Sequence, residues 1–310
     1  MGFLRKKKSS EAPHMDAALP MLTVDQATRL RGLAAADLQA RGMSIDVADD
    51  HLVSQPDGAF FGLWNLAAKV SGQPDVVWPS IVTEHLRTTM AGLDQSESQS
   101  LDLDRLIVRL MPEDADALGP IMTYAREWMP GVWCALAVDL PESVQTVTDK
   151  LLDEVEDVDE AYQRGLQRLR EDFASADFQV SELPQDQPPT FTAAVSDWVY
   201  AGSTPLIMDA VLARFAPQAD PTSSVLFCVP NRHQFAFHVI DAPEPAMHAL
   251  MHLPHYAMVG FNEVPGPLTP FVYVWHDGQV TQITRVDGET LVAEIPVWLG
   301  ELLGQETSPE

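Results

Sequence analysis

Three histidines have the most chemically suggestive spacing in this sequence. His248, His252 and His255 lie within the segment MHALMHLPHYAM. On a helix, His248 and His252 share a face one turn apart, so their imidazoles can converge on a metal ion. A metal site needs three or four ligands, and no carboxylate stands at a familiar ligand spacing from this group. One hypothesis is therefore a metal-dependent enzyme, and the other is a core helix with histidines on its polar flank.

The acidic run between Asp149 and Glu160 is a second place where a cation could bind. It holds seven acidic residues against the single base Lys150. Calcium loops need carboxylates at defined positions and a glycine at the sharp turn, and this run contains no glycine. Acids also favour the first turn of a helix, and Asp157 with Glu160 has the spacing of a capping box. We predict a solvated helix start here.

Motifs of common enzyme classes are missing from the sequence. It contains no Gly-x-Ser-x-Gly, no His-Glu-x-x-His and no glycine-rich phosphate-binding pattern. We interpret Ser203, just before Pro205, as a helix cap and not as a nucleophile. The catalytic residues are therefore unknown, no cofactor is indicated, and the pattern favours a role other than catalysis.

Charge narrows the range of partners. The formal net charge is −26, although Arg5, Lys6, Lys7 and Lys8 form a basic cluster near the N-terminus. Such an acidic chain repels phosphate backbones, which excludes bulk nucleic-acid binding. The basic cluster allows weak peripheral contact with an anionic membrane. Apolar runs such as 133–138 fall far short of the roughly 20 residues of a membrane-spanning helix, so we expect no transmembrane segment.

The two cysteines point to a reducing compartment. Cys134 and Cys228 lie in apolar, strand-like runs where a thiol behaves as a small hydrophobic group. Two cysteines in a chain of 310 residues are few for a disulfide-stabilised protein. We therefore predict a cytoplasmic protein.

Local signals predict the elements of the first part of the chain. Thr23 and Gln26 have capping-box spacing before a helix that Gly42 ends. Residues 43–47 are predicted as a strand, followed by a hairpin and helices over 63–70 and from Pro79 towards Met90. The polar stretch 92–104 is predicted as a loop. Further predictions are a strand over 106–110, a helix from about Pro120, strands at 133–138 and after Pro141, and a helix after Asp157.

The second part carries stronger hairpin signals. Strands are predicted at 191–195 and 198–200, followed by a helix opened by Pro205. A hairpin over 225–240, a helical segment from about Pro245 and a hairpin turning at Asp277-Gly278 come next. A short helix is predicted near the C-terminus.

Paired strands interspersed with helices are typical of the α+β class. We predict antiparallel hairpins with packed helices in two similar-sized halves. The expected organisation is a disordered basic leader over 1–20, a first α+β half over 21–175, a second α+β half over 190–300, and a tail over 301–310.

The order of these segments resembles the YtpQ-like family of uncharacterised bacterial proteins. Three blocks carry the resemblance: WCALAVDLPESVQTVT with the helix DEAYQRGLQRLREDF, the segment DWVYAGS before a helix, and VLFCVPNRHQFAFHV with the later LTPFVYVWHDGQV. His233 and Gln234 depart from the family, which tends to have an acid and an aliphatic residue there. The resemblance implies the fold and a cytoplasmic bacterial setting, and it supplies no catalytic residues.

Taken together, these features predict a non-catalytic protein-binding or regulatory module with an acidic surface. Its expected partner is another protein, selected for a basic or neutral surface. The alternative is the metal-dependent enzyme built on His248, His252 and His255.

Overall fold

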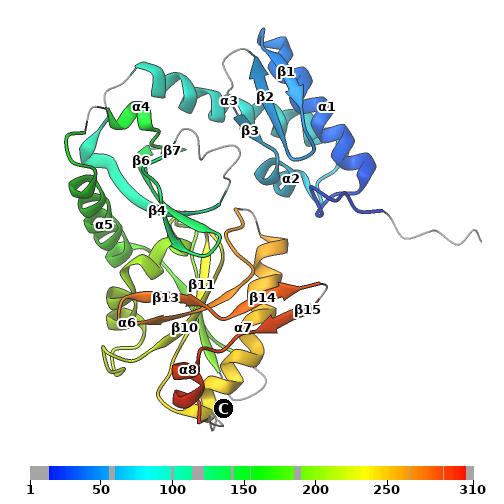
Figure 1. Cartoon of the computed structure of the whole chain (residues 1–310). Helices are drawn as coiled ribbons and strands as arrows, with labels where there is room; N and C mark the ends of the chain where they lie inside the picture. The colour runs from blue at the N-terminus through cyan, green and yellow to red at the C-terminus, as the bar shows by residue number, and fades with distance from the viewer. Residues whose placement is uncertain are drawn as a thin grey trace, which may run out of the picture. The chain divides into compact units, whose positions relative to one another are not determined.

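The computed structural model describes residues 14–55, 60–98, 101–113, 122–140, 143–153, 155–184, 190–264, 266–288 and 290–304. The chain forms two compact units, unit 1 over residues 1–87 and unit 2 over 88–310 (Figure 1). Their boundary falls inside helix α3 (Trp78–Ser98). These units do not coincide with the similar-sized halves expected at 21–175 and 190–300.

Unit 1 combines a three-stranded antiparallel sheet with helices. The strand order is β1-β2-β3. Thr23 Oγ1 accepts from the backbone N–H of Gln26, and the Gln26 side chain accepts from Thr23, so the predicted capping box is confirmed. The elements are α1 (Val24–Ala40), β1 (Ser44–Val47), β2 (His51–Gln55), β3 (Phe60–Gly62), α2 (Trp64–Val70) and the 3₁₀ helix η1 (Asp75–Val77).

The ordered part of unit 1 begins before the predicted start at residue 21. Leu19 is fully buried, and Asp16 lies 2.8 Å from Arg31 in an ion pair. Hydrogen bonding to Arg31 holds the pKa of Asp16 below its usual value. A leader disordered through residue 20 is therefore wrong for residues 14–20, because these contacts attach them to α1.

Unit 2 contains two larger sheets. In the first, β6 pairs with β4, β5 and β7, always antiparallel. In the second, six antiparallel strands have the order β13-β12-β10-β11-β9-β8. The strands are β4 (Leu106–Pro112), β5 (Arg126–Met129), β6 (Val132–Leu140), β7 (Ser143–Thr146), β8 (Gln179–Leu183), β9 (Phe191–Val195), β10 (Val225–Asn231), β11 (Gln234–Val239), β12 (Val272–His276) and β13 (Gln279–Gln282).

Helices pack on both faces of the six-stranded sheet. One face carries Leu226 and Cys228 against the buried side of α7, and the other carries Phe227 and Phe235 towards the β4–β6 sheet. The remaining elements of unit 2 are η2 (Leu103–Arg105), α4 (Asp149–Leu152), α5 (Val158–Ser175), η4 (Ala201–Ile207), α6 (Met208–Phe215), α7 (Pro243–Glu263), the hairpin of β14 (Thr284–Asp287) and β15 (Thr290–Ala293), and α8 (Val297–Leu302).

One hydrophobic core explains why the chain does not divide near residue 180. It combines Val108 and Leu136 of the first sheet, Leu169 of α5, and Phe227 and Phe235 of the second sheet. Separating residues 21–175 from 190–300 would cut this core in two.

Several predicted elements differ in detail. Helix α3 continues to Ser98, so residues 92–98 are helical and not a loop. Residues 122–125 form a turn before β5, where a helix from Pro120 was expected; residues 114–121 lie outside the described residues. Residues 198–200 form a turn leading into η4 and not a strand. Leu303, inside the tail expected over 301–310, packs in the core beside α7, and residues 305–310 lie outside the described residues.

The chain is an α+β protein, as predicted. The hairpins at β10–β11 and β12–β13 are confirmed, the latter turning at Asp277 and Gly278, which both have positive φ. None of the described helices is long and apolar enough to cross a membrane.

Candidate functional site

A groove of about 500 Å³ lies between helix α5 and the η2–β4 segment of unit 2. Leu103, Asp104 and Leu106 line it on the η2–β4 side. The other side is one polar face of α5, whose members recur every three or four residues: Glu160, Gln163, Arg164, Gln167, Arg168 and Glu171.

Helix α5 begins and docks for reasons visible in its sequence. Asp157 Oδ1 accepts hydrogen bonds from the backbone N–H groups of Asp159 and Glu160, so Asp157 caps the helix as predicted. The capping box is not completed, because the Glu160 side chain accepts from Arg164. Tyr162, Leu169 and Phe173 are buried, as their helical spacing predicts. The face opposite these residues is therefore left to form the wall of the groove.

A glycine sets how closely α5 approaches β4. A Cβ on Gly165 would lie 2.7 Å from Cγ2 of Val108, so the helix can pack this closely against β4 only with a glycine at this position. The close approach places the polar face of α5 beside η2.

The arginines of the groove are already paired with acids. Arg164 lies 2.8 Å from Glu160, and Arg168 lies 2.9 Å from Asp172, one helical turn away in each case. The hydrogen bond to Asp172 raises the pKa of Arg168. These arginines therefore contribute little free positive charge.

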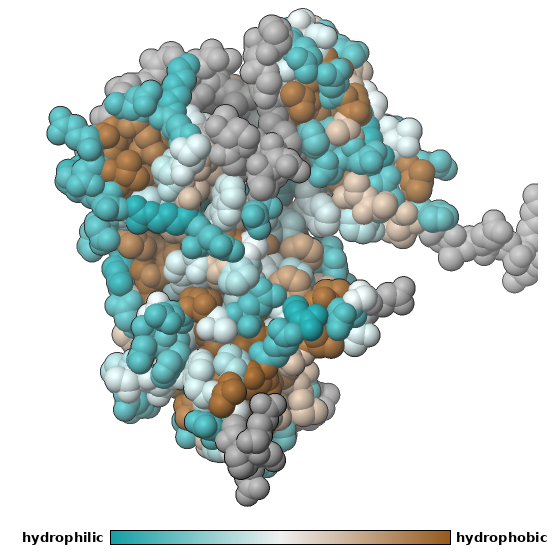
Figure 2. Space-filling model, in the orientation of Figure 1, coloured by the Kyte–Doolittle hydropathy of each residue, from teal (hydrophilic) through white to brown (hydrophobic). Residues whose placement is uncertain are grey.

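Two carboxylates of the groove form no ion pair with a described residue. Glu171 accepts a hydrogen bond from the Gln167 amide at 2.8 Å, and its charge also contributes to the raised pKa of Arg168. Asp104 is exposed, and its side chain makes no hydrogen bond or ion pair with another described residue. The net charge of the groove is negative for this reason. Figure 2 shows hydrophilic residues along the edge of unit 2 where Figure 1 places α5.

The chemistry available in the groove is recognition of a cation. Carboxylates accept charge-assisted hydrogen bonds from guanidinium or ammonium groups. The Gln163 side chain adds an amide that can bond to a peptide backbone, since it both donates and accepts.

The three histidines are placed along one helix and not around a common point. His248 and His255 are exposed on α7, and His252 is partly exposed. The helix continues through Pro254. No three His, Cys, Asp or Glu side chains within the described residues are grouped as metal ligands. The metal-dependent alternative stays a prediction.

The acidic run after Asp149 has the structural role that was predicted. Asp149 Oδ2 accepts from Thr123, Asp157 caps α5, and Asp159 forms an ion pair with Arg126. These carboxylates begin a helix and bind neighbouring side chains.

Both cysteines are free and buried. Burial raises the pKa of Cys134 to about 12 and raises that of Cys228 as well. Neither thiol is therefore a nucleophile at neutral pH.

Comparison with known proteins does not identify a function for this groove. No family model, curated protein or solved structure matches the chain. The resemblance to the YtpQ-like family is untested by these comparisons and stays a prediction.

Sequence reasoning did not find the groove. The polar face of α5 is readable from its spacing, but the opposing wall at Asp104 lies in the stretch expected to be a loop. Only the tertiary placement of η2 shows that Asp104 and Glu171 line the same groove.

Proposed function

We propose that this protein is a non-catalytic binding module that holds a basic segment of a partner protein in the groove between α5 and η2. The observation that carries the proposal is the pair of unpaired carboxylates, Asp104 and Glu171, in a groove whose arginines are neutralised. The net charge of −26 favours the same class of partner, because a long-range negative potential steers basic segments towards the chain.

The proposal includes a cytoplasmic, bacterial setting and membership of the YtpQ-like family. The free, buried thiols of Cys134 and Cys228 support a reducing compartment. The sequence blocks around Trp133 and Trp198 support the family.

The test is binding of a fluorescently labelled, lysine- and arginine-rich peptide, measured by anisotropy at low and at physiological salt. The protein variants are Asp104→Asn, Glu171→Gln and the double variant that carries both substitutions. Glu263→Gln, at the exposed end of α7, is the matched control. We expect the double variant to weaken binding by about tenfold, equivalent to about 1.4 kcal/mol, and the control to leave it unchanged.

Non-specific attraction to an acidic protein is the competing explanation. It would make the single variants Asp104→Asn, Glu171→Gln and Glu263→Gln weaken binding equally, and that result would overturn the proposal. A glutamate-rich peptide of the same length should show no binding at either salt concentration.

A further inference from the structure

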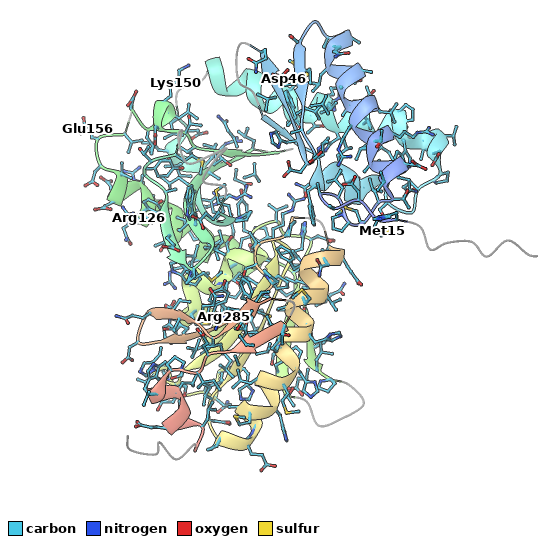
Figure 3. All side chains as sticks on the ribbon, turned by 45° about the vertical axis from the view of Figure 1, so that its right-hand side comes forward. Met15, Asp46, Arg126, Lys150, Glu156 and Arg285 are labelled. Atoms are coloured by element: carbon cyan, nitrogen blue, oxygen red, sulfur yellow. The ribbon has the colours of Figure 1, made fainter. Side chains whose placement is uncertain are left out.

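Three arginines of unit 2, Arg109, Arg214 and Arg232, form no ion pair with another described residue. Most arginines of this unit form surface ion pairs, including Arg126 and Arg285, which Figure 3 labels. Arg214 instead donates to the backbone carbonyls of Phe173 and Ala176. Within the described part of the chain, the terminal guanidinium nitrogens of Arg109 and Arg232 have neither an ion pair nor a hydrogen-bond acceptor. The chain contains 45 acidic residues against 19 basic ones, so a shortage of acids is not the reason.

Consecutive residues of η4 form hydrogen bonds with the backbones of Arg232 and of Leu110, the residue that follows Arg109. Gly202 N–H donates to the carbonyl of Arg232 at 3.0 Å. Ser203 Oγ accepts from the backbone N–H of Leu110, next to Arg109, at 2.9 Å. A Cβ on Gly202 would lie 2.4 Å from the Asn231 carbonyl oxygen and 3.0 Å from Cα of Arg232, so the approach requires a glycine. Helix η4 thus joins the strand that carries Arg109 to the β10–β11 turn that carries Arg232.

The side chain of Arg232 is held in one orientation. It lies over Gly266, where a Cβ would be 2.7 Å from its Cδ. Its Nε–H donates to Nε2 of His233 at 3.0 Å, and Nδ1 of His233 donates to the Ser196 carbonyl at 3.2 Å. This network leaves the two terminal nitrogens of Arg232 without a partner among the described residues.

The environment of Arg109 is recessed, and the nearby carboxylate of Asp139 is hydrogen-bonded to Tyr200. Arg109 is partly buried between buried Val108 and Leu110 on β4. Its neighbours Tyr200 and Tyr124 use their hydroxyls elsewhere, Tyr200 on Asp139 at 2.9 Å and Tyr124 on the Val147 carbonyl at 2.6 Å. Burial raises the pKa of both tyrosines, so they stay neutral and do not offset the charge.

The charges of Arg109 and Arg232 are therefore poorly solvated, and the charge of Arg109 acts on Arg232. Burial lowers the pKa of Arg109, while burial and then the charge of Arg109 lower the pKa of Arg232. A guanidinium nevertheless stays protonated in proteins. Buried like charges are unfavourable unless an anion lies between them.

We propose that Arg109 and Arg232 together bind the phosphate group of a small molecule. A phosphate monoester carries a charge of about −1.5 to −2 at neutral pH, which matches two guanidinium groups, whereas a carboxylate would neutralise only one. Its three oxygens accept from the planar forks of both arginines. The site is separate from the groove of α5 and does not depend on the proposed function.

The test is calorimetric titration of the full chain with inorganic phosphate at constant ionic strength. Glycerol phosphate serves as an ester, and acetate and sulfate as comparison anions. We expect saturable binding of inorganic phosphate or of the ester, and much weaker binding of acetate. Preference between the first two identifies the source of the phosphate group. No saturable binding of either, or acetate binding as tight as that of both, would overturn the proposal.

Substitutions locate the binding. Arg109→Gln and Arg232→Gln should each weaken phosphate binding at least tenfold, whereas Arg170→Gln, which alters a surface ion pair with Asp209, should not. Circular dichroism checks that each variant is folded. If either glutamine variant does not fold, Arg232→Lys keeps the charge and removes the fork, and it should still weaken binding several-fold. Unchanged binding in folded variants would contradict the assignment.

Discussion

The Nε–H group of Arg232 donates a hydrogen bond to Nε2 of His233, which makes that ring nitrogen an acceptor. Nδ1 of the same ring must then carry the proton that it donates to the Ser196 carbonyl. His233 is therefore neutral in the folded protein, and protonating it would place a second cation against Arg232.

This hydrogen bond predicts how stability depends on pH. Burial, followed by the charge of Arg232, lowers the pKa of His233 below its usual 6.5. The unfolded chain binds a proton near pH 6.5 while the folded chain does not, so the contribution of His233 is fully present above that pH. It is lost as the pH falls from 6.5 through the lowered pKa of the folded state.

The measurement is urea unfolding between pH 8 and pH 5 for wild type, His233→Gln and, as control, His248→Gln, which alters an exposed residue. His238 also has a pKa lowered mainly by burial, and it is present in all three proteins. Wild type and the control keep both His233 and His238, so both should lose stability steeply as the pH falls. His233→Gln should show a shallower one. Parallel curves for all three proteins would mean that His233 does not titrate in this way.

Gly202→Ala should destabilise the protein by about 1–3 kcal/mol or more, because the new methyl group would meet the backbone oxygen of Asn231 at 2.4 Å. A backbone atom held in a sheet cannot move aside cheaply. Gly32→Ala is the matched control, since no atom lies within 4 Å of its Cβ position in α1. It should stabilise its helix by about 0.5–1 kcal/mol. Equal effects of both substitutions on the free energy of unfolding would contradict the close approach.

Ser203→Ala should cost about 1–3 kcal/mol, because it leaves the buried N–H of Leu110 without an acceptor. Ser203 was expected to cap a helix, and in the structure it caps the free edge of β4 instead. Ser175→Ala, at an exposed hydroxyl at the end of α5, is the control and should change stability by no more than about 0.5 kcal/mol. Hydrogen exchange at Leu110 gives a second measurement: the amide should lose protection in Ser203→Ala.

Local sequence signals correctly predicted the elements that are determined by residues close to one another in the sequence. The Thr23–Gln26 capping box and the Asp277-Gly278 turn are confirmed because neighbouring side chains and backbone torsions determine them. The role of Ser203 was missed because its partner, Leu110, is 93 residues away.

The same limit applies to the candidate sites. Arg109 interrupts the otherwise apolar run LIVRLM, which could have drawn attention to it. In a strand, however, a single arginine is as readily explained by solvent exposure. Its lack of an acidic partner follows from the packing of η4 and β4, which no short motif encodes.

Removing the charge of Arg109 should abolish phosphate binding while leaving the protein folded. Without phosphate, Arg109→Met should raise the free energy of unfolding by about 1–3 kcal/mol, because an apolar side chain of similar length replaces a poorly solvated cation beside Arg232. With phosphate at about 100 times its Kd, wild type should gain about 2.7 kcal/mol and the variant nothing. Arg170→Met should keep the full phosphate-dependent gain. If Arg109→Met instead lowers stability by the same amount with and without phosphate, Arg109 only supports the fold.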